Sequence, residues 1–207
     1  MINYVGDLKK GKNVLTDINN KHETMLMDIS VFNLEKAQNE VFFEENKETA
    51  LLLLNGKIEI VWEGQNAVLE RGNVFDESPT CLHVPKGVTI DLKALENSEV
   101  LIQKTENNNK FDSKLYLQED CTSEIFGDGV WNDTARRVVR TVFDYKNAPY
   151  SNMVMGEVIN YPGKWSSYPP HHHPQPEVYF YKFNKPQGFG LCLVGEEAFK
   201  IKNNSFL

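Results

Sequence analysis

The sequence has few cysteines and no long apolar run. Its 207 residues include three cysteines, an odd number, scattered as Cys81, Cys121 and Cys192 without a CxxC pair. No disulfide framework is expected, so a reducing compartment is favoured. The N-terminal residues 1–14 lack the apolar core of a signal peptide, and no run approaches 18 apolar residues. We therefore expect a soluble, cytoplasmic protein.

An excess of basic residues is also missing. Lys and Arg number 22 against 29 Asp and Glu, which gives a net charge of −7. This balance argues against nucleic acid or an anionic membrane as the main partner, because both attract basic patches. Apolar residues make up 41% and charged residues 25%, as in ordinary globular proteins. The length allows one large domain or two of about 100 residues each.

Helical periodicity is scarce, and short β-branched and aromatic runs separated by Gly, Asn, Asp and Pro favour a barrel or sandwich. Residues 50–62 are expected to form two strands joined by a hairpin turn at Asn55-Gly56, since both residues tolerate positive φ. The polar residues 106–110 interrupt the strand pattern, which then resumes. We therefore predict two all-β domains, residues 1–110 and 111–207.

The clearest ligand pattern lies between Gly163 and Tyr181. In an extended strand His171 and His173 point to the same face, and a proline bend could bring the carboxylate of Glu177 over both imidazoles. Two imidazoles and a carboxylate suit Zn, Mn, Fe, Co or Ni. An HxH pair alone is more often incidental. The added Glu and the flanking glycines match the first cupin motif, G-x(n)-H-x-H-x(3,4)-E-x(n)-G.

The wider context is more specific than this motif. The stretches Gly163-Lys-Trp-Ser-Ser-Tyr-Pro-Pro-His171, Glu177-Val-Tyr-Phe-Tyr-Lys-Phe183 and Pro186-Gln-Gly-Phe-Gly190 closely resemble the 5-deoxy-glucuronate isomerases of inositol catabolism. That family is a bicupin related to the 4-deoxy-L-threo-5-hexosulose-uronate ketol-isomerases. The resemblance is dense from about residue 127 to 194 and looser in the first half.

The resemblance implies an all-β bicupin, with two tandem cupin (double-stranded β-helix) barrels, that works as an isomerase in carbohydrate metabolism. The implied reaction is the aldose–ketose isomerisation of 5-deoxy-D-glucuronate to 5-dehydro-2-deoxy-D-gluconate, in myo-inositol catabolism. The implied cofactor is a divalent metal (Zn, Mn or Fe) on His171, His173 and Glu177. The base is left open between Glu177, Tyr179, Tyr181 and a hydroxide on the metal. The expected partners are a small-molecule uronate sugar and, in a homo-oligomer, further copies of the chain.

Two departures from the family accompany this resemblance. Only three residues separate His173 from Glu177, whereas the family has a wider, acidic spacing. The segment that carries a fourth metal ligand in cupins would begin near Leu207, so the second barrel is expected to be incomplete at its C-terminus. The same ligand set also leaves open a non-haem iron dioxygenase or a non-catalytic sugar-binding cupin.

Two arginines are candidates for binding the substrate carboxylate. Arg137 and Arg140 match a T-R-x-V-R stretch of the family, and a planar guanidinium recognises a carboxylate well. Their odd offset places them on opposite faces of a strand, so we expect only one to reach the site. Surface pairing with acidic residues is the alternative. The first half offers only His22 and His83, at no ligand-like spacing, and is expected to be a scaffold without metal.

Overall fold

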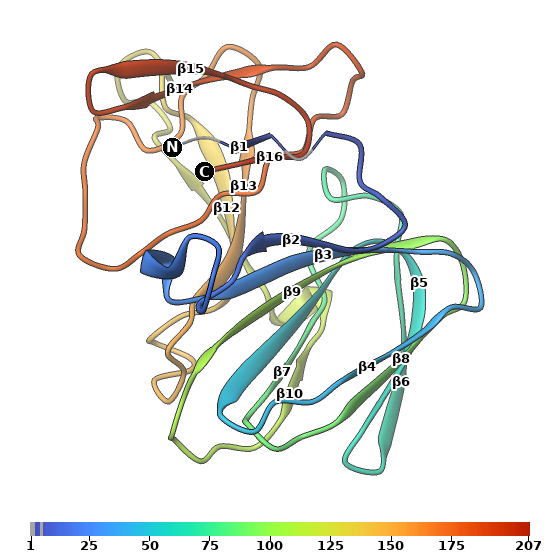
Figure 1. Ribbon diagram of the computed structural model, residues 1–207. Helices are drawn as coiled ribbons and strands as arrows, with labels where there is room; N and C mark the ends of the chain where they lie inside the picture. The colour runs from blue at the N-terminus through green and yellow to red at the C-terminus, as the bar shows by residue number, and fades with distance from the viewer. Residues whose placement is uncertain (1–2, 5) are drawn as a thin grey trace.

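The chain is built almost entirely from strands in the computed structural model, which describes residues 3–4 and 6–207 (Figure 1). Within these residues, helical structure is limited to two three-residue 3₁₀ turns, η1 (Glu23–Met25) and η2 (Gln118–Asp120). No helix in the described part of the chain is long and apolar enough to cross a membrane. The expected all-β class is confirmed.

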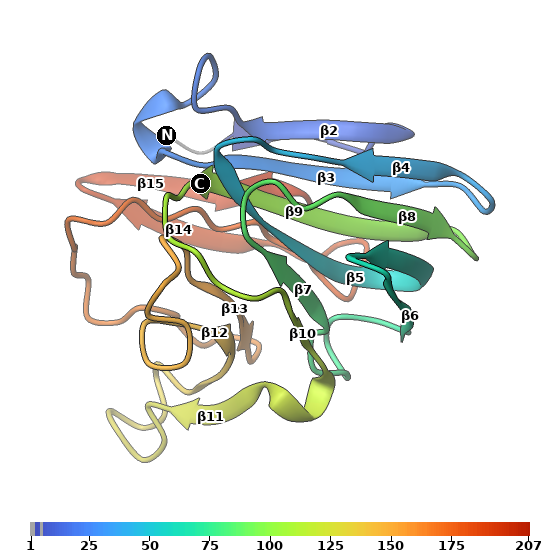
Figure 2. The same ribbon diagram turned by 90° about the horizontal axis from the view of Figure 1, so that it is seen from below.

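Nine strands between residues 11 and 116 form one sheet system around the long strand β5. They are β2 (Gly11–Thr16), β3 (Asp28–Leu34), β4 (Asn39–Phe42), β5 (Lys47–Trp62), β6 (Gln65–Arg71), β7 (Cys81–Val84), β8 (Ile90–Ala94), β9 (Ser98–Glu106) and β10 (Lys114–Tyr116). The order on one path is β10-β7-β5-β9-β3-β2, as Figure 2 shows. The second half of β5 leaves this path to pair with β6 and β8. The single strand β5 therefore takes part in both sides of the barrel.

The leucines of β5 divide between two cores because alternate side chains of a strand point to opposite faces. Leu51 and Leu53 enter the first core, which fills the interior of the N-terminal barrel with side chains such as Trp62 and Leu82. Leu52 faces a second core on the other side. Burial of each leucine contributes about 1.5–3 kcal/mol, so this run anchors both layers.

The expected hairpin at Asn55-Gly56 is wrong. Strand β5 continues through it with a register shift between Leu53 and Asn55, and the chain reverses later, at Glu63-Gly64. Those two residues have φ of 44° and 75°, as the two central residues of a tight hairpin turn require. Gly56 serves close packing instead, because a Cβ there would lie 2.3 Å from the hydroxyl oxygen of Ser98.

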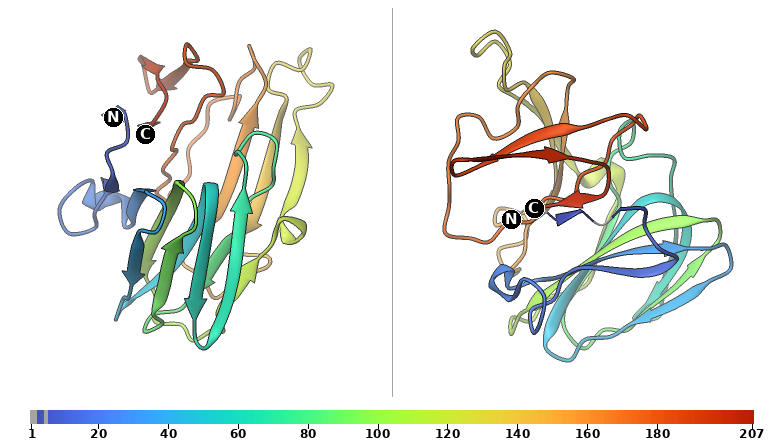
Figure 3. Two further views of the ribbon diagram at one scale, coloured as in Figure 1. Left: turned by 90° about the vertical axis from the view of Figure 1, so that its right-hand side faces the viewer. Right: turned by 45° about the horizontal axis from the view of Figure 1, so that its top comes forward.

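The second half contributes smaller sheets. Strands β11 (Thr122–Phe126), β12 (Arg137–Phe143) and β13 (Met155–Asn160) form an antiparallel sheet, and β14 (Gly190–Val194) and β15 (Glu197–Ile201) form a hairpin. Strand β1 (Asn3–Tyr4) pairs with β16 (Ser205–Phe206), so the two ends of the described chain lie side by side near that hairpin (Figure 3).

Both halves share the second core. It joins Leu15 and Leu52 of the first half to Phe143 and Met155 of the second. Strand β10, which lies beyond the expected boundary at residue 110, pairs with β7 of the first sheet. Strand pairing therefore crosses that boundary, and the division into residues 1–110 and 111–207 stays a prediction.

Candidate active site

The segment from Glu177 to Phe183 runs extended beside β16. The amide of Tyr179 donates to the carbonyl of Leu207 at 2.9 Å, and that of Tyr181 donates to the carbonyl of Ser205 at 2.9 Å. The expected strand is thus present as an extended segment with one bridge, Phe180 to Phe206.

Alternation along this segment separates its side chains into two groups. Val178 and Phe180 pack against the second core. Glu177, Tyr179 and Tyr181 consequently lie on the opposite face, as expected from the sequence. The rings of the two tyrosines are 6.1 Å apart, centroid to centroid.

Two of the three expected metal ligands are in contact. The Nε2 atom of His173 lies 3.1 Å from Oε2 of Glu177, and both side chains are about half exposed. His171 instead places Nδ1 3.0 Å from the carbonyl oxygen of Pro169. Among residues 3–4 and 6–207 the structure gathers no group of three His, Cys, Asp or Glu side chains able to hold a metal.

The donor chemistry of this segment still fits a divalent ion. A neutral imidazole and a carboxylate side by side are two ligands of the kind that Zn, Mn and Fe accept. The second imidazole sits two residues earlier, in a stretch of turns and irregular backbone.

Tyr179 connects Glu177 to two further residues. Burial raises the pKa of Tyr179, and its hydrogen bond to Glu177 acts in the same direction; Ser167, through a hydrogen bond, and the charge of Arg137 oppose this. Ser167 was not identified from the sequence as a site residue, although it lies in the Trp-Ser-Ser-Tyr stretch of the motif. The phenol of Tyr179 therefore interacts with the carboxylate of Glu177 and the hydroxyl of Ser167.

Tyr181 is more deeply placed. Burial raises the pKa of its phenol well above the usual value, and a hydrogen bond with the thiol of Cys192 adds to the shift. Burial likewise raises the pKa of the Cys192 thiol. Cys192 on β14 was another residue without an expected role, and only its position on an alternating strand could have placed it here. The phenol is a hydrogen-bond donor at neutral pH.

The two candidate arginines lie on opposite faces of β12. Arg137 is partly buried, donates to the carbonyl of Ala135 at 3.0 Å and lies 5.6 Å from the ring centre of Phe126. Its charge opposes the rise in the pKa of Tyr179, which makes Arg137 the candidate of the two for a place near the site.

The guanidinium of Arg140 makes its hydrogen bonds away from the candidate site. It is 9% exposed and donates to three backbone carbonyls of the loop at residues 74–77, at 2.7–3.1 Å. Its Nη1 atom also lies 3.6 Å from the carboxylate of Glu157. The side chain therefore holds this loop against β12 and faces the first half of the chain.

The two histidines of the first half have different surroundings. His83 is fully buried, 2.8 Å from Oε2 of Glu48, and its ring stacks on Phe143 at 4.3 Å. His22, for which no role was expected from the sequence, lines a pocket of about 190 Å³ that Glu177 also lines. This pocket extends the candidate site toward the η1 turn.

Comparisons with known proteins give a family match over most of the chain. The model of the KduI/IolB family matches residues 3–206. The chain is similar to a protein named 5-deoxy-glucuronate isomerase from Halalkalibacterium halodurans, 26% identical over 200 residues that cover 88% of this chain and 71% of that protein. The protein of the same name from Lacticaseibacillus casei is 25% identical over 199 residues, with the same two coverages.

Two solved structures share the fold over nearly the whole chain. An IolB-like protein from Salmonella typhimurium LT2 has a TM-score of 0.83 at 15% identity and covers 100% of this chain and 82% of its own. The protein Ylba from E. coli has a TM-score of 0.66 at 13% identity, covering 99% and 80%. The expected cupin fold and the resemblance drawn from the motifs are confirmed.

Proposed function

The chain belongs to the KduI/IolB family, and from this premise we propose that it is a 5-deoxy-glucuronate isomerase. The reaction interconverts 5-deoxy-D-glucuronate and 5-dehydro-2-deoxy-D-gluconate, a step of inositol catabolism. The observation that carries the proposal is the match over residues 3–206, together with relatives of that name that cover 88% of the chain. The substrate is a small uronate sugar.

The reaction is an internal redox change that needs no external oxidant. The carbonyl moves from C1 to C2 as one proton leaves C2 and another is added at C1. We assign a divalent metal (Zn, Mn or Fe) to His171, His173 and Glu177. When bound, such a metal supplies Lewis-acid polarisation of the carbonyl and hydroxyl oxygens. The chain's own residues must then position the sugar and carry the proton.

We assign these tasks by contact and charge. Glu177 is the carboxylate on the site face and is the candidate to accept and return the proton. Tyr179 donates a hydrogen bond to it and fixes its orientation. Tyr181 keeps its proton because burial raises its pKa. It therefore serves as a donor to a substrate oxygen.

Arg137 is the candidate to bind the substrate carboxylate. Its charge on β12 opposes the rise in the pKa of Tyr179, and a guanidinium pairs with a carboxylate through two parallel hydrogen bonds. Arg140 is unsuited to this role because three backbone carbonyls and Glu157 already occupy its donors. The odd offset between the two residues explains this division of roles.

Metal content and oxygen dependence test the proposal together. Elemental analysis should find about one divalent ion per chain in the wild-type protein and much less in a His171→Ala/His173→Ala variant. The His172→Ala variant is the matched control and should keep its metal.

Turnover of the uronate aldose should be equal with and without oxygen. Oxygen uptake coupled to product formation would instead identify a dioxygenase. Metal and sugar binding without any turnover would identify a binding protein.

A further inference from the structure

The hairpin of β14 and β15 has one face that is open to solvent and apolar. Its strands pair Leu191 with Lys200 and Leu193 with Ala198. These four side chains share a face, because directly opposite residues of antiparallel strands point the same way. Leu191 and Leu193 are 63% and 52% exposed. The hairpin lies at one end of the molecule in Figures 1 and 3, so this face is accessible to a partner.

The opposite face of the hairpin packs on the protein. Ile201 on β15 is buried, and Cys192 on β14 forms a hydrogen bond with the phenol of Tyr181. Both belong to the alternate set of residues that pairs Gly190 with Ile201 and Cys192 with Phe199. The hairpin is therefore anchored through this face, and the leucine face points away from the molecule.

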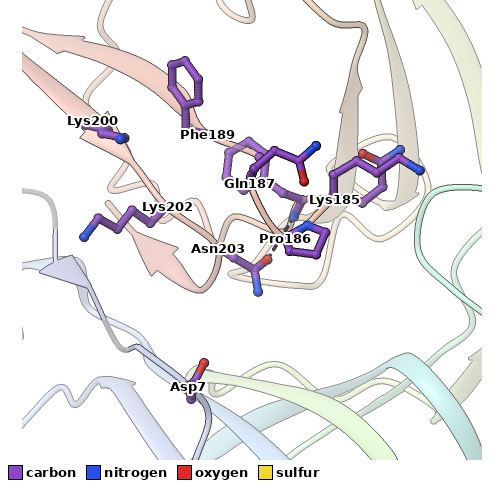
Figure 4. A pocket seen from close by; sticks show the side chains of 11 residues that line it. Asp7, Lys185, Pro186, Gln187, Phe189, Lys200, Lys202 and Asn203 are labelled. Atoms are coloured by element: carbon purple, nitrogen blue, oxygen red, sulfur yellow. Dashed lines mark hydrogen bonds between the residues drawn. The ribbon is translucent and has the colours of Figure 1, made fainter.

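Phe189 extends the apolar row at the base of the hairpin. Its ring is 59% exposed, and the ammonium group of Lys200 lies 5.2 Å from the ring centre. Figure 4 shows the two side chains next to each other. The row of Phe189, Leu191 and Leu193 is thus continuous on one face, and a contiguous exposed apolar patch marks an interaction surface.

The two ends of the hairpin carry opposite charges. At the tip, Glu196 in the turn and the adjacent Glu197 are exposed and bring two carboxylates. At the base, Lys200 and Lys202 bring two ammonium groups, beside the hollow drawn in Figure 4. A surface that is acidic at one end and basic at the other is complementary to a second copy of itself turned by 180°. This symmetry indicates which partner the apolar row fits.

We propose that the leucine face of the β14–β15 hairpin is the interface of a homodimer. A twofold axis between Leu191 and Leu193 sets the apolar rows of the two copies against each other. The same axis brings Glu196 of each copy over the lysine end of the other. The face is small beside the roughly 800 Å² per partner of a standard interface, so the dimer should dissociate at micromolar concentrations. The isomerase reaction does not enter this argument, and the proposal does not depend on it.

Sedimentation velocity over a concentration series around the micromolar range tests the proposal. The wild-type protein should pass from monomer to dimer as its concentration rises. Leu191→Thr/Leu193→Thr should weaken dimerisation by at least about tenfold, since apolar burial drives association. Threonine keeps the strand propensity of these positions, and circular dichroism checks that the variant is folded. The control Val41→Thr/Val68→Thr removes two comparably exposed apolar side chains from β4 and β6 and should dimerise like the wild type.

Charge reversal at low salt tests the twofold arrangement itself. Glu196→Lys and Lys200→Glu should each weaken the dimer, because like charges then face each other across the axis. Glu196→Lys/Lys200→Glu should restore it, and Lys36→Glu, a change at an exposed lysine of the first half, should have no effect.

Four results would overturn the proposal. They are a wild-type protein that stays monomeric throughout the series, an undiminished dimer in Leu191→Thr/Leu193→Thr, an equal loss in the valine control, and additive weakening in the double charge reversal. Isomerase turnover is measured separately, so failure of either proposal leaves the other standing.

Discussion

The guanidinium of Arg71 donates two hydrogen bonds of 2.8 Å each to the carboxylate of Glu157, which lies 86 residues later in the sequence. The Arg71 side chain is fully buried and also donates to the carbonyls of Leu53 and Glu77. Glu157 lies opposite Arg140 in the β12–β13 ladder. One carboxylate therefore joins the sheet that carries the candidate site to the end of β6.

Loss of this carboxylate should destabilise the whole protein. Glu157→Ala leaves the buried charge of Arg71 without its partner, which typically costs about 3–5 kcal/mol. Urea denaturation should show a large drop in the unfolding midpoint. The exposed pair Lys57–Glu70 is the control, and Glu70→Ala should leave the midpoint unchanged. Equal midpoints for Glu157→Ala and the wild type would contradict this role.

Glu48 should hold the segment before β13 in place. Its carboxylate is fully buried, contacts His83, and accepts from the amide of Asn152 at 2.7 Å and from the hydroxyl of Ser151 at 3.0 Å. Glu48→Ala should lower stability by about 3 kcal/mol, since several donors lose their acceptor. Hydrogen exchange at Asn152 should accelerate in this variant but not in Glu45→Ala, an exposed control. Unchanged protection of Asn152 would contradict the assignment.

Replacement of Arg137 should affect activity, whereas replacement of Arg140 should affect stability. Arg137→Ala should lower kcat/KM by about ten- to a hundredfold with little change in stability, because a charged substrate contact is lost. Arg140→Ala should instead lower the denaturation midpoint, because the loop at residues 74–77 loses its donors. Arg137→Lys should recover part of the activity. A fully stable but inactive Arg140→Ala variant would reverse the assignment.

Cys121 should react slowly with alkylating agents at neutral pH. Burial raises the pKa of its thiol to about 11, with smaller contributions in the same direction from Asp120 and Glu157. The thiolate is therefore scarce at pH 8, and the rate should rise about tenfold per pH unit up to pH 10, since only the thiolate is nucleophilic.

Peptide mapping after iodoacetamide treatment, with urea-unfolded protein as the reference, measures this rate. Modification of native Cys121 at pH 8 as fast as in urea would contradict the raised pKa.

Much of the fold could be predicted from the sequence because strand alternation and turn residues are local signals. The opposite faces of Arg137 and Arg140 follow from the same period of two. The Asn55-Gly56 dipeptide misled because its turn propensity was overridden by packing: β5 pairs through it and Gly56 lies against Ser98. The local turn propensity of a residue is overridden where strand pairing or close packing involves the same residue.

The candidate site was predicted less completely. The side chains of His173 and Glu177 are in contact, but the prolines around the histidines give irregular backbone instead of a strand, and His171 bonds to the carbonyl oxygen of Pro169. Ser167 and Cys192 reach the tyrosines from distant segments, and no periodic pattern marks such contacts. Likewise, nothing in the sequence pairs Arg71 with Glu157, because ion pairs between remote strands depend on the assembled fold.

The site around Glu177 is proposed to isomerise a uronate sugar. Proton NMR of 5-deoxy-D-glucuronate incubated under argon with metal-loaded protein measures this conversion. Wild-type protein should form 5-dehydro-2-deoxy-D-gluconate, and Glu177→Gln should slow this by at least about a hundredfold, while His172→Ala should match the wild type. No conversion by the wild type with Zn, Mn or Fe, or equal conversion by Glu177→Gln, would contradict the account.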